Sequence, residues 1–356
     1  MKVGIIVGDP ESEDKIEVSS RSWLKNVNST YITNRRSPYV LLKPNGNIIN
    51  RVMDKNTKYV DIYVSIYYYL LHKYSNTEYI HFELIYPNEI SYDKLMNNDV
   101  NFYNFYDPIA AGVVGNRKII AKTEKYYNLL KSLPEDKVYP PIKFYDFQSN
   151  KCTYYNYFKK NKIPILPFVC IDQKRWKKSK NVPSLFHQTF VKPVGGTSGI
   201  DTTLYPKHNE TKQQSIKRMQ QFITKTFKKK YPSLIFQKYD PSFASKTEEV
   251  RSIYVGNTYQ YSIVSKSISE GEGQAYGMAL LKQDGGTYTY SSQKLSKIKK
   301  FGYKVIKLIQ KFYGNLPQLN IRVDTGTTSD GKIFLNEIEF AGSFFPSWFR
   351  NKNKLN

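Results

Sequence analysis

The sequence predicts an α/β (α+β) protein in which an α/β domain precedes a region of antiparallel hairpins and helices. The apolar run at 2–9 ends in Gly-Asp, as the opening strand of an α/β domain does. Residues 248–269 and 322–340 have the pattern of β-hairpins, with turn signals at Gly256-Asn257 and Asp330-Gly331. An apolar stripe at helical spacing over 295–314 indicates a long amphipathic helix that ends at a glycine cap.

Between these elements the pattern alternates between helix and strand. Residues 150–171 predict a helix, a turn and a strand, and residues 183–205 predict a strand, a glycine-rich loop and a strand. Residues 233–241 predict a strand that ends at a proline. The stretch at 59–74 mixes strand and helix signals and stays unassigned. This order predicts a first domain over residues 1–145.

Composition limits the class of protein. The chain has 356 residues, of which 40% are hydrophobic, enough for two or three domains. Two cysteines, Cys152 and Cys170, cannot form a disulfide framework, which suggests a reducing compartment. The start is a poor signal peptide, and the longest apolar runs are too short to span a bilayer. We therefore expect a soluble cytoplasmic protein without a membrane partner.

The formal net charge of +24 favours anionic partners. Lysine, asparagine and tyrosine are abundant throughout, so the charge can equally be compositional, and both readings stay open. The basic clusters at 174–180, 225–230 and 294–300 are scattered along the chain. Because no zinc spacing and no RNA-binding aromatic motif accompanies them, we do not expect a nucleic-acid partner.

Residues 322–340 gather acids in this basic chain. If Asp330-Gly331 forms a two-residue turn, Asp324 faces Glu337 and Arg322 faces Glu339 across the hairpin. Side chains alternate along a strand, so these four share one face. Two carboxylates opposite each other repel, and we expect positive charge between them. The other face is apolar and suits a core, with Ile321, Val323, Ile338 and Phe340.

Three further stretches carry candidate binding residues. In residues 190–199 a strand ends at Lys192 and continues into a glycine-rich loop, which can cradle phosphate oxygens or be an ordinary hairpin loop. Gln237 and Lys238 end an apolar strand. They could recognise a nucleotide base there, or they could be polar only because the strand leaves the core. Charges on the 248–269 hairpin are either part of a site or exposed on the surface; they are Glu249, Arg251 and Lys266.

Together these pieces resemble the ATP-grasp superfamily, most closely the carboxylate–amine ligases of the D-alanine–D-alanine ligase type. The matching features are a helix that begins with Lys151, Val-Lys-Pro before a Gly/Ser loop, and a Glu-x-Arg hairpin. Glu337 follows Asp324 by 13 positions, and Ser198 follows Lys192 by six, as in that family. The opening "GIIVGDPESEDKIEVSSRS" is also similar. The resemblance covers about residues 150–343 and the first 21.

The resemblance implies an ATP-grasp fold with an N-terminal pre-ATP-grasp α/β domain. The implied domains are 1–145, a central subdomain at 146–235 with the phosphate loop, and a C-terminal subdomain at 236–356 with the metal site. ATP and two Mg²⁺ are the implied cofactors, with Asp324, Glu337 and Glu339 as metal ligands. The implied catalytic residues are Arg322, Lys192 and Ser198. The implied nucleotide-binding residues are Lys151, Lys192, Gly195, Gly196, Thr197, Ser198, Gln237, Lys238, Tyr239, Glu249, Arg251 and Lys266.

The chain departs from the family pattern at three positions. Glu339 stands where the family has Asn, Ser343 stands where it has Gly, and Lys15 stands where an acid holds the first substrate's amine. Lys15 speaks against D-alanine as the substrate. For Arg322, a structural ion pair with Glu339 is the alternative to stabilising an oxyanion.

The expected activity is therefore an ATP- and Mg²⁺-dependent ligation of a carboxylate to an amine through an acyl phosphate. The expected partners are small-molecule or peptide carboxylate and amine substrates. An ATP-grasp kinase of a polyanion such as an inositol phosphate is the alternative, and a non-catalytic nucleic-acid-binding protein is the third reading. The identity of the substrates and the oligomeric state are open at this point.

Overall fold

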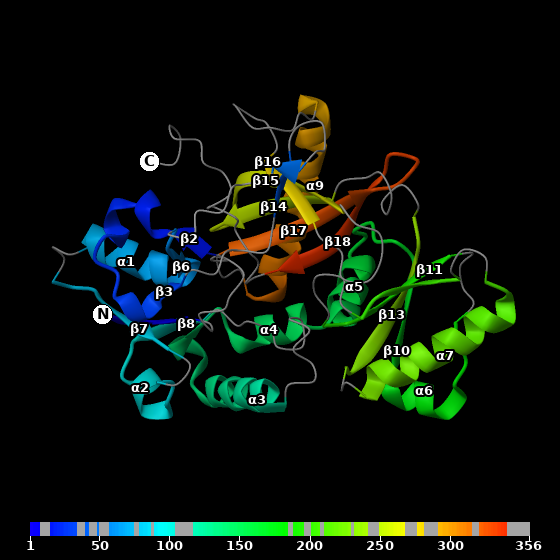
Figure 1. Ribbon diagram of the computed structural model, residues 1–356, viewed down its shortest axis with the longest axis horizontal. Coiled ribbons are helices and arrows are strands. Elements are labelled where there is room, and N and C mark those ends of the chain that lie inside the picture. Colours follow the sequence, from blue (N-terminus) through cyan, green and yellow to red (C-terminus); the bar gives the residue numbers. More distant parts are fainter. Residues whose placement is uncertain are drawn as a thin grey trace. The chain divides into compact units, whose positions relative to one another are not determined.

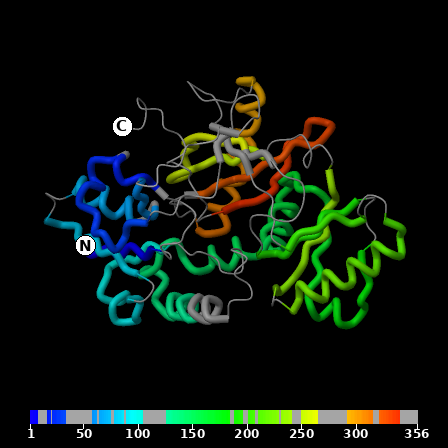
Figure 2. The backbone as a smooth tube through the Cα atoms, in the orientation of Figure 1, coloured from blue at the N-terminus to red at the C-terminus, as the bar shows by residue number. Residues whose placement is uncertain are grey.

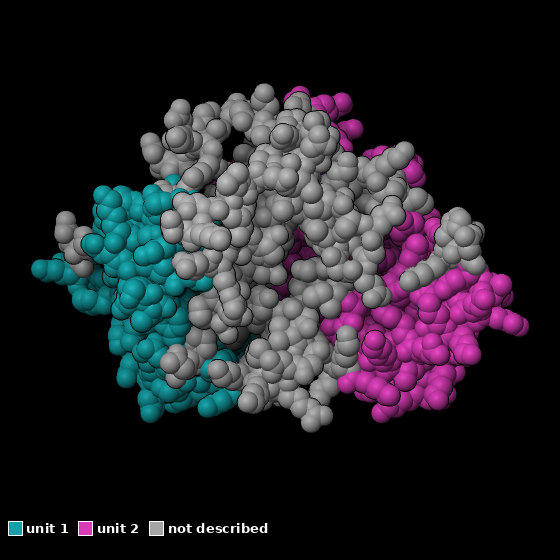
Figure 3. Space-filling model, in the orientation of Figure 1, with its two compact units in different colours: residues 1–106, 122–143, 341–356 teal, residues 107–121, 144–340 magenta. Residues whose placement is uncertain are grey.

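A computed structural model gives the fold (Figures 1 and 2). It divides into two compact units, shown in Figure 3, of residues 1–106, 122–143 and 341–356 (unit 1) and residues 107–121 and 144–340 (unit 2). The described residues are 1–7, 15–33, 40–42, 48–49, 57–74, 78–86, 89–103, 117–183, 188–195, 201–206, 210–228, 231–240, 249–267, 276–280, 291–314 and 320–339.

Unit 1 is built on a parallel sheet of order β7-β1-β8-β9. Alternate residues of β1 face opposite cores: Ile5 packs with Leu24 and Val60, and Ile6 packs with Ile85 and Leu95. The strands are β1 (Lys2–Ile6), β2 (Lys15–Glu17), β3 (Ile32–Thr33), β4 (Val40–Leu42), β5 (Ile48–Ile49), β6 (Tyr59–Asp61), β7 (His81–Ile85), β8 (Val100–Tyr103) and β9 (Val138–Tyr139). The helices are α1 (Ile62–Tyr74) and α2 (Tyr92–Met96), while α3 (Arg117–Ser132) and α4 (Ile142–Gln148) cross the division between the units.

Unit 2 contains two antiparallel sheets. The first has the order β10-β13-β11-β12, and the second contains the run β18-β17-β14-β15-β16. The strands are β10 (Phe168–Asp172), β11 (Thr189–Pro193), β12 (Thr203–Tyr205), β13 (Ser233–Lys238), β14 (Glu249–Val255), β15 (Thr258–Ser267), β16 (Tyr276–Leu280), β17 (Asn320–Thr327) and β18 (Ile333–Glu339). The helices are α5 (Lys151–Lys160), α6 (Gln173–Ser179), α7 (Lys212–Lys228) and α9 (Ser292–Phe312).

One apolar cluster joins the two sheets of unit 2. It combines Phe158 of α5, Ile235 of β13, Ile309 of α9 and Val323 of β17, all fully or almost fully buried. A second cluster holds α6 and α7 against the first sheet through Trp176, among others. Because α5 lies in the joint core, its first turn is held beside the hairpin β17–β18.

Local sequence signals explain where the helices of unit 2 begin and end. The side chains of Asn150, Asp172 and Ser291 cap α5, α6 and α9 by accepting hydrogen bonds from backbone N–H groups in the first turn. Gly314, just past the end of α9, has φ +71°, which glycine adopts without steric cost. The helix and the strand predicted within 150–171 are confirmed as α5 and β10, and the helix predicted over 295–314 is confirmed as α9.

The two cysteines are paired. Cys152 of α5 and Cys170 of β10 form a disulfide with Cα atoms 6.1 Å apart. One disulfide is not a framework of several, so the reducing compartment expected from the low cysteine count stays a prediction. The two cysteines are 18 positions apart in the sequence. Their pairing could not be predicted from the sequence, because it depends on how α5 packs against β10.

None of the described helices is both long and apolar enough to cross a membrane.

Candidate active site

The charged residues of the hairpin β17–β18 form the predicted cross-strand pairs. Arg322 pairs with Glu339 and Asp324 pairs with Glu337. Val323 and Ile338, on the other face, are buried in the core as expected, whereas Phe340 lies outside the described residues. The charged face is therefore set by strand alternation.

The turn of this hairpin differs from the prediction. The backbone N–H of Thr328 donates to the carbonyl of Lys332, and the backbone N–H of Lys332 donates to the hydroxyl of Thr328. Gly331 takes φ +79°, and the loop has three residues instead of two. A register shift follows between Asp324 and Thr325, where Asn336 is the extra residue of β18. The extra residue in the loop and the extra residue in the bulge shift the register in opposite directions. The pairs on the far side of the bulge from the turn, Asp324–Glu337 and Arg322–Glu339, are therefore the predicted ones.

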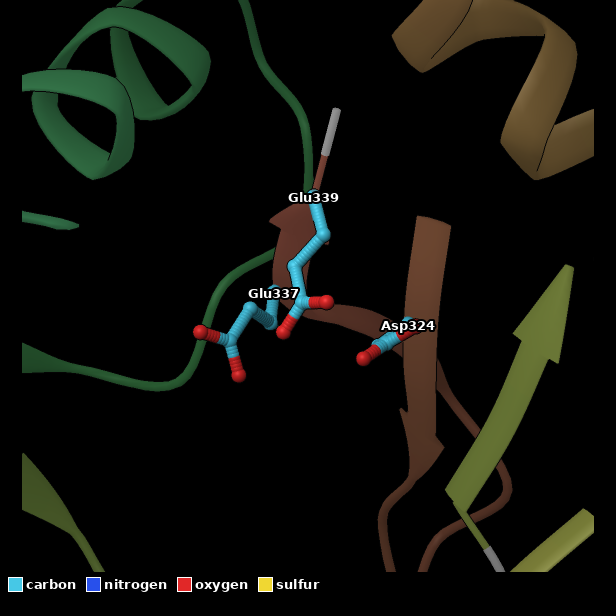
Figure 4. Close-up of side chains that lie close together, drawn as sticks. All are labelled: Asp324, Glu337 and Glu339. Carbon is cyan, nitrogen blue, oxygen red and sulfur yellow. The ribbon is translucent and has the colours of Figure 1, made fainter. Parts of the chain in front are cut away.

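Three carboxylates form the centre of the site (Figure 4). Asp324 comes from β17, and Glu337 and Glu339 come from β18; one ligand oxygen of each lies within 4.8 Å of the others. Asp324 is 1% exposed. So much negative charge away from water requires compensation by cations.

Arg322 supplies part of this compensation. Its Nε and Nη2 donate to the two oxygens of Asp324, both at 2.8 Å, and its Nη1 lies 2.8 Å from Glu339 Oε2. The predicted ion pair between Arg322 and Glu339 is thus present, and Asp324 shares it. The planar guanidinium suits such a fork of two carboxylates.

Lys151 compensates the third carboxylate. Its Nζ lies 2.6 Å from Glu337 Oε1, and both side chains are largely buried. The position of Lys151 in the first turn of α5 is fixed because its backbone N–H donates to the carbonyl of Val194. Lys151 thus supplies positive charge to Glu337, as Arg322 does to Asp324.

Burial and pairing shift the pKa values in different directions. Burial raises the pKa of Asp324 to about 7, with Glu249 adding to the effect and Arg322 opposing it. Burial also raises the pKa of Glu339 against the opposing charge of Arg322. For Glu337, Lys151 and Lys192 outweigh burial, and the pKa is lowered. Glu337 is thus the most readily ionised of the three.

Lys192 lies on β11 and is buried at 8% exposure. Burial lowers its pKa, against the opposing effect of Glu337. Its Nζ donates to the hydroxyl of Tyr155 at 3.2 Å, and that hydroxyl donates to the carbonyl of Asn336. Tyr155 therefore ties Lys192 of the first sheet to the bulge of β18 in the second.

The charges of β14 join the same network. Arg251 Nε donates to Glu249 Oε1 at 2.7 Å and lies 4.0 Å from Asp324 Oδ2. Asn336 Nδ2 donates to the other oxygen of Glu249. Glu249 and Arg251 are therefore part of the carboxylate site and not separate surface charges.

Gln237 of β13 is 3% exposed and lies opposite Phe190 of β11, so strand alternation puts its side chain on the same face of the sheet as Lys192. Its side-chain amide interacts with the hydroxyl of Tyr155. Thr189 Oγ1, on the other face of β11, is buried and has no hydrogen-bond partner among the described residues. Of the two residues that follow Gln237, Lys238 is exposed and Tyr239 is half-buried.

Several predicted residues cannot be placed. Gly195 is described and buried, but Gly196, Thr197 and Ser198 lie outside the described residues, as does the side chain of Lys266. In unit 1, Lys15 pairs across β2 and β6 with the buried Asp61.

The sequence interpretation missed three residues. Tyr155 and Asn336 link Lys192 to the hairpin, and the buried hydroxyl of Tyr154 has no hydrogen-bond partner in the described part of the chain. Burial, and to a smaller extent the negative charge of Glu337, raises the pKa of Tyr154 well above its ordinary value. Helical spacing could have identified the two tyrosines: Tyr154 and Tyr155 follow Lys151 by three and four positions and therefore lie on the same side of α5.

Comparisons with known proteins agree on the fold. D-cycloserine synthetase DcsG superposes with a TM-score of 0.54 at 13% identity, over 79% of this chain and 88% of that one. The ATP complex of D-alanine–D-alanine ligase from Bacillus anthracis gives 0.50 at 11% identity, over 97% and 90% of the two chains. No protein-family model matches the sequence, and no curated protein matches it.

Proposed function

We propose that this chain, which has the ATP-grasp fold, is an ATP- and Mg²⁺-dependent carboxylate–amine ligase that works through an acyl phosphate. The observation that carries the proposal is the face of β17–β18 on which Asp324, Glu337 and Glu339 meet Arg322 and Lys151. An ATP-grasp ligase needs carboxylates for metal and cations for phosphate in one place, and this face brings both together.

The three carboxylates fit Mg²⁺. Their oxygens are hard ligands, and the cluster carries one carboxylate whose lowered pKa keeps it ionised at neutral pH, Glu337. We propose that Asp324, Glu337 and Glu339 hold two ions, with Glu339 in the position where the family has Asn. When bound, the ions would polarise phosphoryl oxygens and offset their charge.

The lysines and a buried side-chain amide of the first sheet fit a nucleotide. Lys192 and Lys151 would pair with phosphate oxygens, and Gly195, Gly196, Thr197 and Ser198 would close over them. The side-chain amide of Gln237, which is buried on the same face of the sheet as Lys192, would donate to an adenine nitrogen, beside Lys238 and Tyr239. Glu249 would reach the ribose, with Arg251 and Lys266 as further members of the nucleotide-binding set.

The chain's own ion pairs must change when these ligands bind. Lys151 is committed to Glu337, so we propose that Lys151 leaves this carboxylate for a phosphate when Glu337 becomes a metal ligand. Such an exchange keeps every buried charge compensated in both states, which avoids the cost of a buried unpaired ion.

The proposed reaction has two steps. A substrate carboxylate oxygen attacks the γ-phosphorus and releases ADP, with Lys192 and Ser198 holding the phosphates. An amine then attacks the acyl carbon, and phosphate leaves. Arg322 would stabilise the oxyanion that develops in this second step. The substrates would be small-molecule or peptide carboxylates and amines, and Lys15 speaks against D-alanine.

The ligase can be tested by trapping its intermediate. Hydroxylamine converts an acyl phosphate into a hydroxamate, whereas the stable phosphate ester made by a kinase does not react. Amino acids, short acidic peptides and inositol phosphates are screened with ATP and Mg²⁺, following ADP, hydroxamate and phosphorylated product. We expect hydroxamate that requires ATP, Mg²⁺ and a carboxylate substrate.

Two other outcomes would replace the proposal. If ADP release follows phosphorylation of an inositol phosphate and no carboxylate is consumed, the kinase reading takes its place. If no substrate stimulates ADP release and isothermal titration shows no nucleotide binding, the chain is not a catalyst of this class.

A further inference from the structure

A basic groove lies between α6 and α7, away from the carboxylate site. It encloses ≈ 460 Å³, and Trp176 forms part of its wall. Its lining includes four lysines, which are Lys180, Lys217, Lys225 and Lys228, and no carboxylate. Figure 1 shows the two helices side by side beneath β10 and β13. Lysines from two basic stretches that are far apart in the sequence thus line one groove: Lys180 follows α6, and Lys225 and Lys228 lie on α7.

The positive charge of the chain is concentrated in this part of the molecule. Residues 151–240 hold 19 of the 54 lysines and arginines but only 4 of the 30 aspartates and glutamates. This quarter of the chain therefore carries a formal charge of +15 out of +24. A purely compositional lysine bias would not deplete acids in the same segment.

The acids next to the groove are engaged elsewhere. Asp172 caps α6 through the N–H of Arg175, and Glu210 pairs with Arg218. Among the described residues, no carboxylate comes within 4.0 Å of the ammonium groups of the four groove lysines. Like charges on one helix without intervening acids oppose each other, so an anionic ligand would relieve repulsion that the chain leaves uncompensated.

We propose that this groove binds an acidic segment of a polypeptide. Lys217 and Lys228 are 11 positions apart on α7, about 16 Å along the helix, which an extended chain of about five residues spans. Gln220, Gln221 and Thr224 also line the groove, and their amides and hydroxyl can bond peptide N–H and C=O groups.

Nucleic acid fits the groove less well. Strands without sequence preference bind through exposed aromatic rings on which bases stack. The aromatic side chain of the groove, Trp176, is 4% exposed and packs into the core of the first sheet. The lining cations are also all lysines, without the arginine forks that suit phosphates.

The test is binding of a labelled peptide, Gly-Glu-Glu-Glu-Glu-Gly, to the full chain by fluorescence anisotropy at 50 mM salt. No nucleotide is present, so the result does not depend on the proposed ligase activity. The groove variant is Lys217→Glu with Lys225→Glu. The matched control is Lys300→Glu with Lys307→Glu, which makes the same change of net charge at two exposed lysines of α9.

We expect the groove variant to lose at least about tenfold in affinity, since reversed charges oppose the ligand, while the control stays within about twofold. A peptide with Gln in place of Glu should not bind. Thermal melting by circular dichroism establishes that both variants are folded.

Three results would overturn the proposal. Wild type that does not bind the peptide, or equal losses in both variants, would mean that the groove is no specific site. A single-stranded oligonucleotide of equal charge that binds more tightly than the peptide, and loses affinity only in the groove variant, would make nucleic acid the ligand.

Discussion

Unit 2 holds charge in two regions that differ in burial and in pairing. On the hairpin β17–β18, one fully buried carboxylate, Asp324, and two largely buried ones, Glu337 and Glu339, are matched by Arg322 and Lys151 of the same chain. In the groove between α6 and α7, lysines are exposed and no described carboxylate pairs with them. The comparison shows how burial decides whether a charge needs an internal partner. Water can solvate the lysines, but the carboxylates depend on cations that the fold positions.

The largest expected difference between the regions is in stability. Arg322→Ala leaves Asp324 and Glu339 buried without their cation, and we expect the free energy of unfolding to fall by about 3–5 kcal/mol. Lys225→Ala in the groove should change it by less than about 0.5 kcal/mol. Urea denaturation measures both. Equal losses in the two variants would remove the distinction between the regions.

The next effect is on activity. Glu337→Gln removes one charge from the carboxylate cluster, and we expect Mg²⁺-dependent ATP turnover to fall at least about 100-fold. Glu210→Gln is a matched control, because Glu210 is also ion-paired and has similar side-chain exposure, 19% against 20% for Glu337. Turnover that survives in Glu337→Gln would contradict the metal site.

A smaller effect should follow from the link between the sheets. Tyr155→Phe removes the hydroxyl that accepts from Lys192, and we expect nucleotide affinity to fall about 5–10-fold, as the loss of one buried hydrogen bond would cause. Tyr157→Phe, on the same helix, removes a hydroxyl that donates to the carbonyl of Leu308. Its nucleotide affinity should equal that of wild type. Isothermal titration with a non-hydrolysable ATP analogue compares the two, and equal losses would show that the effect is not specific to Lys192.

The smallest expected effect is a pH dependence of the metal-free protein. Because the pKa of Asp324 is raised to about 7, the folded state binds more protons than the unfolded state between about pH 4.5 and 7. Stability should therefore fall as pH rises through this window, by about 2–4 °C in melting temperature. Asp324→Asn should flatten the profile. A wild-type melting temperature that rises with pH relative to Asp324→Asn would contradict the assignment.

Local pattern was sufficient for the hairpin that carries the site. Strand alternation and turn residues placed Asp324 opposite Glu337 before any tertiary contact was known. The loop length was nevertheless wrong, because a three-residue loop and a bulge at Asn336 cancel each other in the register. Two compensating irregularities leave no trace in the spacing of the paired residues.

Contacts between segments distant in sequence account for the remaining misses. Cys152 and Cys170 meet only when α5 packs on β10, and Tyr155 reaches the carbonyl of Asn336 across 181 positions. The ATP-grasp fold was recognisable from the order and spacing of short motifs. The division into 1–145, 146–235 and 236–356 stays a proposal.

The sequence by itself determined the pairs Asp324–Glu337 and Arg322–Glu339 and the acids, lysines and arginine of the candidate site, because these depend on neighbours within one element or one turn. Tertiary structure decided which cation meets which carboxylate. It also decided that Lys180, Lys225 and Lys228, which come from basic stretches far apart in the sequence, line one groove. The reason is physical: the periodicity of a helix or a strand fixes the face on which a side chain lies, but only the packing of the core brings two such faces together.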